Sequence, residues 1–246
     1  MTILVTGGTG TLGKPTVELL RAAGHDVRVL SRTPTPGNYC GNLTTGEGLA
    51  EAFSDVDTVL HLATTAKSAD VTQARNLVDA SRAAGVEHLV FISIVGVDVL
   101  PSSYYRAKLA SEALIIESGI PFTVLRATQF HEFIRLLVHL QRRLPLILSV
   151  NVPVQPIAAS EVAERLFQLV EAGPSGRVAD AGGPEQLPVR TAIDQWQEAA
   201  GTRKPVVTLR LPLPLLRAMR AGKHMTPLPG FGRQTFADFA ESAVRA

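Results

Sequence analysis

The chain begins with the stretch Thr2 to Gly13, which reads Thr-Ile-Leu-Val-Thr-Gly-Gly-Thr-Gly-Thr-Leu-Gly. Its first four residues are a short apolar run, as a buried parallel strand requires, and a helical pattern follows the last glycine. Gly7 permits a tight turn, Gly10 lets the backbone approach a pyrophosphate, and Gly13 lets the helix pack close to the sheet. A strand, a glycine-rich turn and a helix in this order are typical of the start of a dinucleotide-binding βαβ unit, in which free N–H groups at the helix start bind phosphate oxygens.

Strand and helix patterns alternate along the first half of the chain. We predict strands at residues 2–5, 26–31, 57–63, 87–93 and 121–126, and helices at 12–23, 47–53, 71–84 and 104–118. Residues 33–46 are rich in Pro, Gly, Asn and Thr and are predicted to form a loop with at most a short strand. This alternation predicts an α/β fold with a doubly wound parallel sheet, which is Rossmann-like.

The second half is less regular, and we expect a small C-terminal substrate lobe there rather than an independent domain. A single domain would span 1–246, with its dinucleotide-binding core at 1–127 and mostly the lobe and C-terminal helices at 128–246. Helices are predicted at 129–143, 160–172 and 191–200. The first of these has an apolar side, which we expect to face the core rather than another subunit: Phe130, Phe133, Leu136, Leu137 and Leu140.

Charge and hydropathy limit the classes of partner. The 24 Lys and Arg residues nearly balance the 22 Asp and Glu residues, so no electrostatic footprint for nucleic acid stands out. A local basic stretch is interpreted as a solvated helix face: Arg217, Arg220, Lys223 and His224. The sequence has no apolar run of the ~18 residues that a membrane span needs, so we expect no membrane partner. Because the first residues already form a strand and a turn, no signal peptide is expected, and the predicted location is cytoplasmic.

Cysteine and histidine usage argues against metal chemistry. The single cysteine, Cys40, excludes an internal disulfide and a cysteine-based metal site. The six histidines lack a ligand spacing such as H-E-x-x-H. We therefore predict no metal.

The end of the second predicted strand bears on which dinucleotide is bound. Folds that prefer NAD place Asp or Glu there to bond the ribose 2′-hydroxyl, whereas this chain has Ser31 and Arg32. Arg32 can pair with a 2′-phosphate, and Ser31 and Thr33 can add hydrogen bonds. The sequence therefore predicts NADP(H), with NAD(H) as the less favoured cofactor.

A serine, a tyrosine and a lysine occur in an order that suits carbonyl reduction, around the start of the helix predicted at 104–118. Ser93 ends a strand, and Tyr104 and Lys108 are four residues apart, so their side chains project from one face of a helix. Reduction of a carbonyl needs a hydride from the nicotinamide and a proton from an acid. We expect the ammonium to lower the pKa of the phenol and the serine to hold the substrate oxygen. Tyr105 is the alternative proton donor if the helix is rotated.

The G-x-x-G-x-x-G spacing and several later stretches resemble the short-chain dehydrogenase/reductase family, in its atypical, NmrA-like branch. The similarity continues through Lys108 to Glu112 and Ser118 to Phe130, and covers roughly residues 1–200. It implies that Ser93, Tyr104 and Lys108 are the catalytic residues. The separation of serine and tyrosine is shorter than in many active members. Glu112 lies one helical turn after Lys108 and is expected to pair with it.

The glycine motif and the resemblance together assign a cofactor site and a substrate site. Asn42 lies where the family has an aspartate beside the adenine, and Ala63 and Thr64 would line the nicotinamide ribose. His61 is interpreted as a packed strand residue. The predicted cofactor-binding residues are Gly7, Thr9, Gly10, Thr11, Leu12, Gly13, Ser31, Arg32, Asn42, Ala63, Thr64 and Lys108. The predicted substrate residues follow the carboxyl end of the strand predicted at 121–126: Thr128, Gln129 and Phe130.

These observations favour an NADP(H)-dependent oxidoreductase that reduces a small carbonyl, enone or quinone. The rival hypothesis is a regulator that binds the dinucleotide and senses its redox state without turnover. A third is a scaffold subunit with a vestigial fold. The expected assembly is a monomer or a homodimer.

Overall fold

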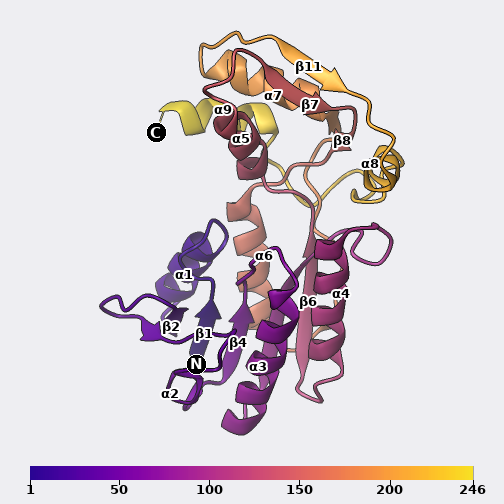
Figure 1. Ribbon diagram of the computed structural model, residues 1–246. Helices are drawn as coiled ribbons and strands as arrows, with labels where there is room; N and C mark the ends of the chain where they lie inside the picture. Colours follow the sequence, from indigo (N-terminus) through magenta and orange to yellow (C-terminus); the bar gives the residue numbers. More distant parts are fainter. Residues whose placement is uncertain (246) are drawn as a thin grey trace. The chain divides into compact units, whose positions relative to one another are not determined.

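The computed structural model describes residues 1–245, which fold around a seven-stranded parallel sheet (Figure 1). The strand order is β3-β2-β1-β4-β5-β6-β9. The sequence predicted a doubly wound parallel sheet, and the observed order is that of this fold, extended by one short strand. The strands are β1 Thr2–Thr6, β2 Asp26–Ser31, β3 Tyr39–Cys40, β4 Thr58–His61, β5 His88–Ile94, β6 Phe122–Ala127 and β9 Gly176–Arg177.

The order of the strands reverses at β1, an inner strand of the sheet. β1 pairs with β2 on one side and with β4 on the other, both in parallel. In an open sheet of this kind ligands bind at the carboxyl ends of the strands beside this reversal. The turn that follows β1, and the loops that follow β2, β4 and β5, therefore border the candidate site.

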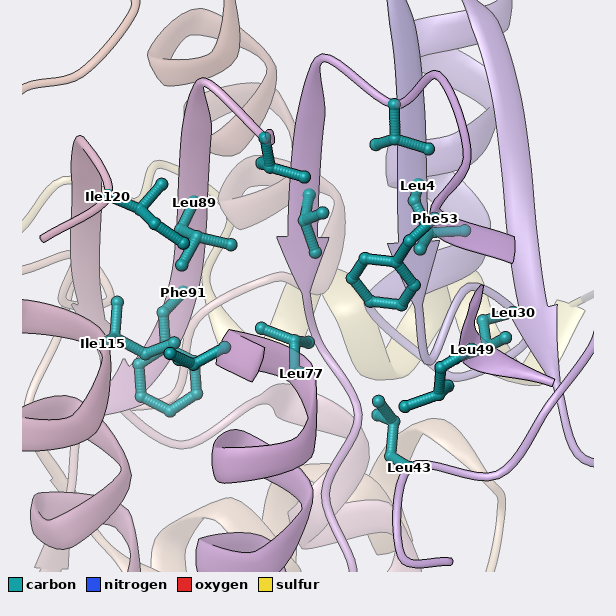
Figure 2. Packing of buried hydrophobic residues seen from close by; sticks show 14 of the residues in the cluster. Leu4, Leu30, Leu43, Leu49, Phe53, Leu77, Leu89, Phe91, Ile115 and Ile120 are labelled. Atoms are coloured by element: carbon teal, nitrogen blue, oxygen red, sulfur yellow. The ribbon is translucent and has the colours of Figure 1, made fainter. Parts of the chain in front are cut away.

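Helices cover both faces of the sheet: α1 Gly13–Ala22, α2 Leu49–Phe53, α3 Ala69–Ala84, α4 Ser103–Ile116 and α6 Ala159–Ala172. α3 packs against α2 and α4 on one face. A hydrogen bond of 2.7 Å joins His25, just after α1, to Glu171 near the end of α6. Figure 2 shows the core between the sheet and the helices on the side of α2, α3 and α4. There Leu4, Phe53 and Leu77 belong to one buried cluster with Leu89 and Phe91. These strands are apolar because both of their faces are buried.

The chain divides into two compact units. Two segments, 94–101 and 162–179, do not follow the predicted boundary at residue 127. The first unit comprises residues 1–93, 102–126 and 162–179, and the second comprises 94–101, 127–161 and 180–246. Most of α6 and all of β9 belong to the first unit because β9 pairs with the edge of β6. The predicted lobe thus returns once to the sheet.

The second unit has its own core. Its elements are α5 His131–Leu140, β7 Ile147–Val150, β8 Pro153–Val154, β10 Leu187–Pro188, α7 Val189–Ala199, β11 Val206–Leu209, α8 Pro214–Arg220 and α9 Phe236–Arg245. α7 packs against α5, α9 and β7. Ile134, Ile147, Ile193, Val206 and Phe236 are among the buried residues of this core.

The predicted orientation of the first lobe helix is wrong. In α5 the buried residues are His131 and Ile134, while Phe133, Leu136 and Leu140 are exposed, the last by 68%. Leu137 packs only partly against the core. The helix has more apolar residues than one buried stripe needs, so periodicity alone did not identify the buried side.

No helix within residues 1–245 combines the length and the apolar character that crossing a membrane requires.

A buried ion pair joins α4 to β6, and it corrects a second expectation. Glu112 was predicted to pair with Lys108, but its carboxylate accepts two hydrogen bonds from the Arg126 guanidinium, at 2.8 and 2.7 Å, and acts on Lys108 only through its charge. The two side chains are 3% and 13% exposed. The strand beside α4 supplies a cation with a planar fork that fits a carboxylate better than an ammonium does.

We predict that Glu112→Gln lowers the free energy of unfolding by about 3–5 kcal/mol, because it leaves the Arg126 charge buried without its counter-ion. Urea unfolding followed by circular dichroism measures this. Asp194→Asn is the matched control, since it breaks the exposed pair with Arg190, which is worth less than about 1 kcal/mol. Equal losses in the two variants would contradict the prediction.

Candidate functional site

The glycine turn after β1 is closely packed on two sides and open on a third. A Cβ atom at Gly7 would lie 2.7 Å from the Ala63 nitrogen, and one at Gly13 would lie 2.1 Å from the Gly7 oxygen. A Cβ at Gly8 would lie 2.9 Å from the Val29 side chain, a constraint that the sequence analysis missed. A Cβ at Gly10 would meet only the Gly7 oxygen, at 3.3 Å.

These clearances fit a dinucleotide. Gly7 and Gly13 bring β1, the loop after β4 and the start of α1 together, while Gly10 leaves its outer side free for a phosphate. The Lys14 N–H donates to the Gly10 oxygen at 3.1 Å, the Thr16 N–H donates to the Leu12 oxygen at 3.3 Å, and Pro15 has no N–H. The N–H groups left for phosphate oxygens are therefore those of the turn that leads into α1. Thr9, Thr11 and Leu12 belong to the same turn. Their contact with a cofactor stays a prediction.

The residues after β2 form a tight local turn with an exposed cation. The Ser31 hydroxyl accepts a hydrogen bond from the Thr33 N–H at 3.2 Å and donates one to the Thr33 oxygen at 3.0 Å. Arg32 is exposed, and its guanidinium has no ion-pair partner among the residues that the structure describes. Asn42 accepts a hydrogen bond from the Thr44 N–H at 2.9 Å, which orders the loop after β3.

Asp70 organises the loop after β4, and the sequence analysis did not single it out. It is 3% exposed in the first turn of α3. Its carboxylate accepts hydrogen bonds from the Thr64 hydroxyl at 2.5 Å, the Thr65 N–H at 2.7 Å and the Thr65 hydroxyl at 2.6 Å. The available signal was a lone aspartate after a Thr-Thr pair at the start of a helix, where a carboxylate is stabilised by the helix dipole.

His61 is a packed strand residue, as the sequence suggested. Its side chain bonds the Thr6 hydroxyl at 2.7 Å and stacks on Phe91, with ring centroids 5.4 Å apart. Burial, reinforced by the nearby charge of Lys108, lowers the pKa of His61 to about 3. The ring is therefore neutral at physiological pH.

Tyr104 and Tyr105 are both half-buried and meet edge to face, but they have different surroundings. The Thr64 side chain acts to lower the pKa of Tyr104, so it is Tyr104 that lies beside the loop after β4. Burial raises the pKa of Tyr104 above 10.0, and the negative charge of Asp70 adds to this effect. Burial raises the pKa of Tyr105 to about 12.

The expected lowering of the tyrosine pKa by Lys108 is wrong for this structure. The Lys108 ammonium donates a hydrogen bond to the Ile92 oxygen at 3.2 Å and lies 4.7 Å from the centre of the Phe91 ring. It thus points at β5, and desolvation dominates the pKa of the phenol. Burial also lowers the pKa of Lys108 itself to about 8, although Asp70 and Glu112 oppose this.

Ser93 lies beside Ile92 near the carboxyl end of β5. It is 1% exposed, and within residues 1–245 its hydroxyl oxygen has no hydrogen-bond partner. A buried hydroxyl without a partner costs free energy, so Ser93 is a candidate to bind a ligand atom.

The first unit therefore brings together the ends of β4 and β5 and one face of α4. The predicted substrate residues begin the second unit, where two of them have partners of their own. The Thr128 hydroxyl accepts a hydrogen bond from Gly183 N–H at 3.3 Å, and the Gln129 amide donates one to the His224 oxygen at 3.3 Å. Phe130 forms an isolated bridge with Ile157. Their role toward a substrate stays a prediction. Within the described part of the chain no cluster of His, Cys, Asp and Glu could hold a metal ion.

We predict that the free energy of unfolding rises between pH 8 and pH 10 because of Lys108. Its pKa is about 8 in the folded chain against an ordinary 10.5, so in this window the unfolded chain binds more protons, and stability increases by at most about 1.4 kcal/mol per pH unit. Above pH 10 the tyrosines, whose pKa values are raised on folding, act in the opposite direction. Chemical unfolding over this range should show the rise in the wild type and not in Lys108→Met.

The matched control is Lys67→Met, which removes an exposed ammonium near the same loop. It should keep the wild-type slope. Parallel stability curves for the wild type and Lys108→Met would contradict the assignment.

The family comparison and two curated relatives agree with this geometry. Residues 7–135 match the model of the NAD(P)H-binding family. The photosystem II assembly factor Ycf39 of Trieres chinensis is 30% identical over 149 residues, which are 54% of this chain and 47% of that protein. An NmrA-like family domain-containing oxidoreductase of Aspergillus flavus is 31% identical over 144 residues, which are 51% of this chain and 47% of that protein. The chain thus spans about half the length of the curated relatives it matches.

Solved structures share the fold. The NADPH complex of the quinone oxidoreductase QOR2 from Escherichia coli superimposes with a TM-score of 0.82 and 19% identity, covering 98% of this chain and 99% of that one. The family match extends over more than half of the chain and includes the glycine turn, the loop after β4 and α4. The chain therefore belongs to the NAD(P)H-binding family, in its NmrA-like, atypical short-chain dehydrogenase/reductase branch.

Proposed function

We propose that this protein is an NADP(H)-dependent oxidoreductase that reduces a small carbonyl, enone or quinone. The observation that carries the proposal is the half-buried phenol of Tyr104, which lies beside Thr64 in the loop that touches the glycine turn. Lys108, one helical turn away, reaches Ile92 beside the orphaned hydroxyl of Ser93. An acid, a cation and a free hydroxyl thus converge at the carboxyl edge of the sheet.

The pKa of Tyr104 suits the direction of reduction. When bound, the reduced nicotinamide supplies the hydride. A carbonyl that accepts a hydride develops negative charge on its oxygen, which must then take up a proton. Because burial raises the pKa of Tyr104, the phenol stays protonated at neutral pH and can donate that proton. The Ser93 hydroxyl can donate a hydrogen bond to the same oxygen, and positioned acids of this kind contribute about 10²–10⁴-fold to a rate.

Lys108 and His61 have supporting roles in this proposal. The Lys108 ammonium has donors beyond the one that binds Ile92, and these can hold the ribose hydroxyls of a dinucleotide. Neutral His61 keeps Thr6 and the end of β4 in place without competing as an acid, since its pKa is lowered to about 3.

The preference for NADP(H) rests on Arg32. Its exposed guanidinium follows the end of β2, where a 2′-phosphate lies in this fold, and no carboxylate occupies positions 31 to 33. The QOR2 structure of the same fold is an NADPH complex. The names of two relatives, a quinone oxidoreductase and an NmrA-like oxidoreductase, support the class of acceptor.

A non-catalytic dinucleotide sensor is the alternative, favoured by the relative that is named an assembly factor. A sensor needs the glycine turn and Lys108 but has no use for a proton donor. Substitution of the donor therefore separates the two functions.

We predict that Tyr104→Phe lowers the rate of NADPH oxidation with the best of a panel of quinones, enones, aldehydes and ketones by about 10²–10⁴-fold. Affinity for NADPH should stay within a few-fold, because the phenol is assigned to the substrate. Steady-state kinetics and calorimetry measure the two quantities.

Tyr105→Phe is the matched control and should retain turnover. Full turnover in Tyr104→Phe would move the proton donor elsewhere. Tight NADPH binding by the wild type without turnover of any acceptor would favour the sensor.

We also predict that Arg32→Ala weakens NADPH binding by about tenfold to a hundredfold, the equivalent of one charge-assisted hydrogen bond of about 1.5–3 kcal/mol. Binding of NADH should change little, since it has no 2′-phosphate. Calorimetric titration of the wild type and the variant with each cofactor gives the change in the two affinities. An equal loss of affinity for NADPH and NADH would refute the role of Arg32.

A further inference from the structure

The second unit leaves an unusual amount of apolar surface exposed. Nine of the sixteen most exposed large apolar side chains among residues 1–245 lie in two short segments, 133–148 and 207–213. They are between 36% and 68% exposed. We call them the leucine surface: Phe133, Leu136, Leu140, Leu144, Leu148, Val207, Leu209, Leu211 and Leu213.

The pair of strands β7 and β11 is apolar on both of its faces. Ile147, Ser149 and Val206 are buried, and Ile147 and Val206 belong to the core of the second unit. Leu148 pairs in register with Val207, and both are exposed. A sheet with one solvated face normally carries polar residues there, so this face is suited to a partner.

Hydrogen bonds connect the parts of the leucine surface. The Gln141 side chain, directly after Leu140, binds the Leu148 N–H at 2.8 Å and the Leu148 oxygen at 3.2 Å. These bonds join the end of α5 to β7. At the other end, the Arg220 guanidinium of α8 donates to the Leu211 oxygen at 3.3 Å. Together with the pairing of β7 and β11, these contacts hold the segments of the leucine surface next to one another.

The two longer stretches of chain that contain the leucine surface carry only positively charged side chains. Residues 133–160 and 199–237 contain ten arginines and lysines and no aspartate or glutamate, although the whole chain has a formal net charge of only +2. Arg142 and Arg143 stand between Leu140 and Leu144, and Arg210 stands between Leu209 and Leu211. These three arginines are exposed.

This combination argues against a second copy of the chain as the occupant. A two-fold contact would set the same patch against itself, and its cations would face cations. Leucines interleaved with arginines instead match a bilayer interface that carries negative charge, where the leucines enter the acyl boundary and the arginines reach the headgroup phosphates.

We propose that the leucine surface, with Arg142, Arg143 and Arg210, docks on a membrane surface that contains anionic lipids. Docking of this kind needs no spanning helix. It revises the expectation that the protein has no membrane partner. It does not depend on the proposed enzymatic activity.

The test is flotation of the full chain with vesicles of phosphatidylcholine, alone or mixed with phosphatidylglycerol. We expect the wild type to float with the mixed vesicles at low salt, to float little with phosphatidylcholine alone, and to dissociate as salt screens the charges. The triple variant Arg142→Glu, Arg143→Glu, Arg210→Glu should bind the mixed vesicles at least about a hundredfold more weakly, since each cation near such a surface contributes about fivefold.

Two further variants separate charge from apolar contact and folding. Arg21→Glu, Arg75→Glu, Arg177→Glu makes the same change of charge in the first unit and should float like the wild type. Leu136→Ser, Leu140→Ser, Leu209→Ser keeps the charge and should lower the binding that survives at high salt. Thermal unfolding by circular dichroism confirms that each variant is folded.

Three results would overturn the proposal: no flotation of the wild type at low salt, equal weakening by the two charge variants, or a dimer in light scattering that only the leucine-to-serine variant dissociates. The second result would indicate binding by net charge alone. The third would assign the surface to a second copy of the chain.

Discussion

The close approach of the backbone at Gly7 and Gly13 is the constraint on which the first unit depends. At Gly7 the end of β1 touches the loop that leaves β4, and at Gly13 the start of α1 touches the turn itself. A side chain at either position would separate these segments. Because β1 is the strand at which the order reverses, with β2 on one side and β4 on the other, the same contact positions both the phosphate end and the reacting end of the candidate site.

Burial determines the protonation states at the reacting end. It lowers the pKa of His61 and of Lys108 and raises that of Tyr104. Each shift favours the neutral form, as desolvation predicts. Asp70 acts against this for the two bases, since its charge raises the pKa of both His61 and Lys108. The same carboxylate orders the Thr64–Thr65 turn. Asp70 therefore determines the shape of the loop and also influences the pKa values of its neighbours.

The second unit is organised differently. Its core uses only part of its apolar residues, and its cations are gathered in segments that contain no acid. A nearly balanced net charge therefore conceals two segments of the second unit, 133–160 and 199–237, that carry only positive charge. This segregation is the reason that composition alone excluded a charged partner, whereas the positions of the exposed leucines and arginines point to one.

The sequence by itself determined the elements of the first half, the glycine turn and the family, because these depend on local properties: apolar strands, turn-forming glycines and helix periodicity. Even the short third strand and the packed role of His61 followed from it. Only the tertiary structure decided the partner of Glu112, the direction of the Lys108 ammonium and the importance of Asp70, because each results from a neighbour that is distant in sequence or from burial. The exposed face of α5 was likewise decided by tertiary packing, in which α7 contacts α5, since the apolar residues of this helix extend beyond the side that is buried.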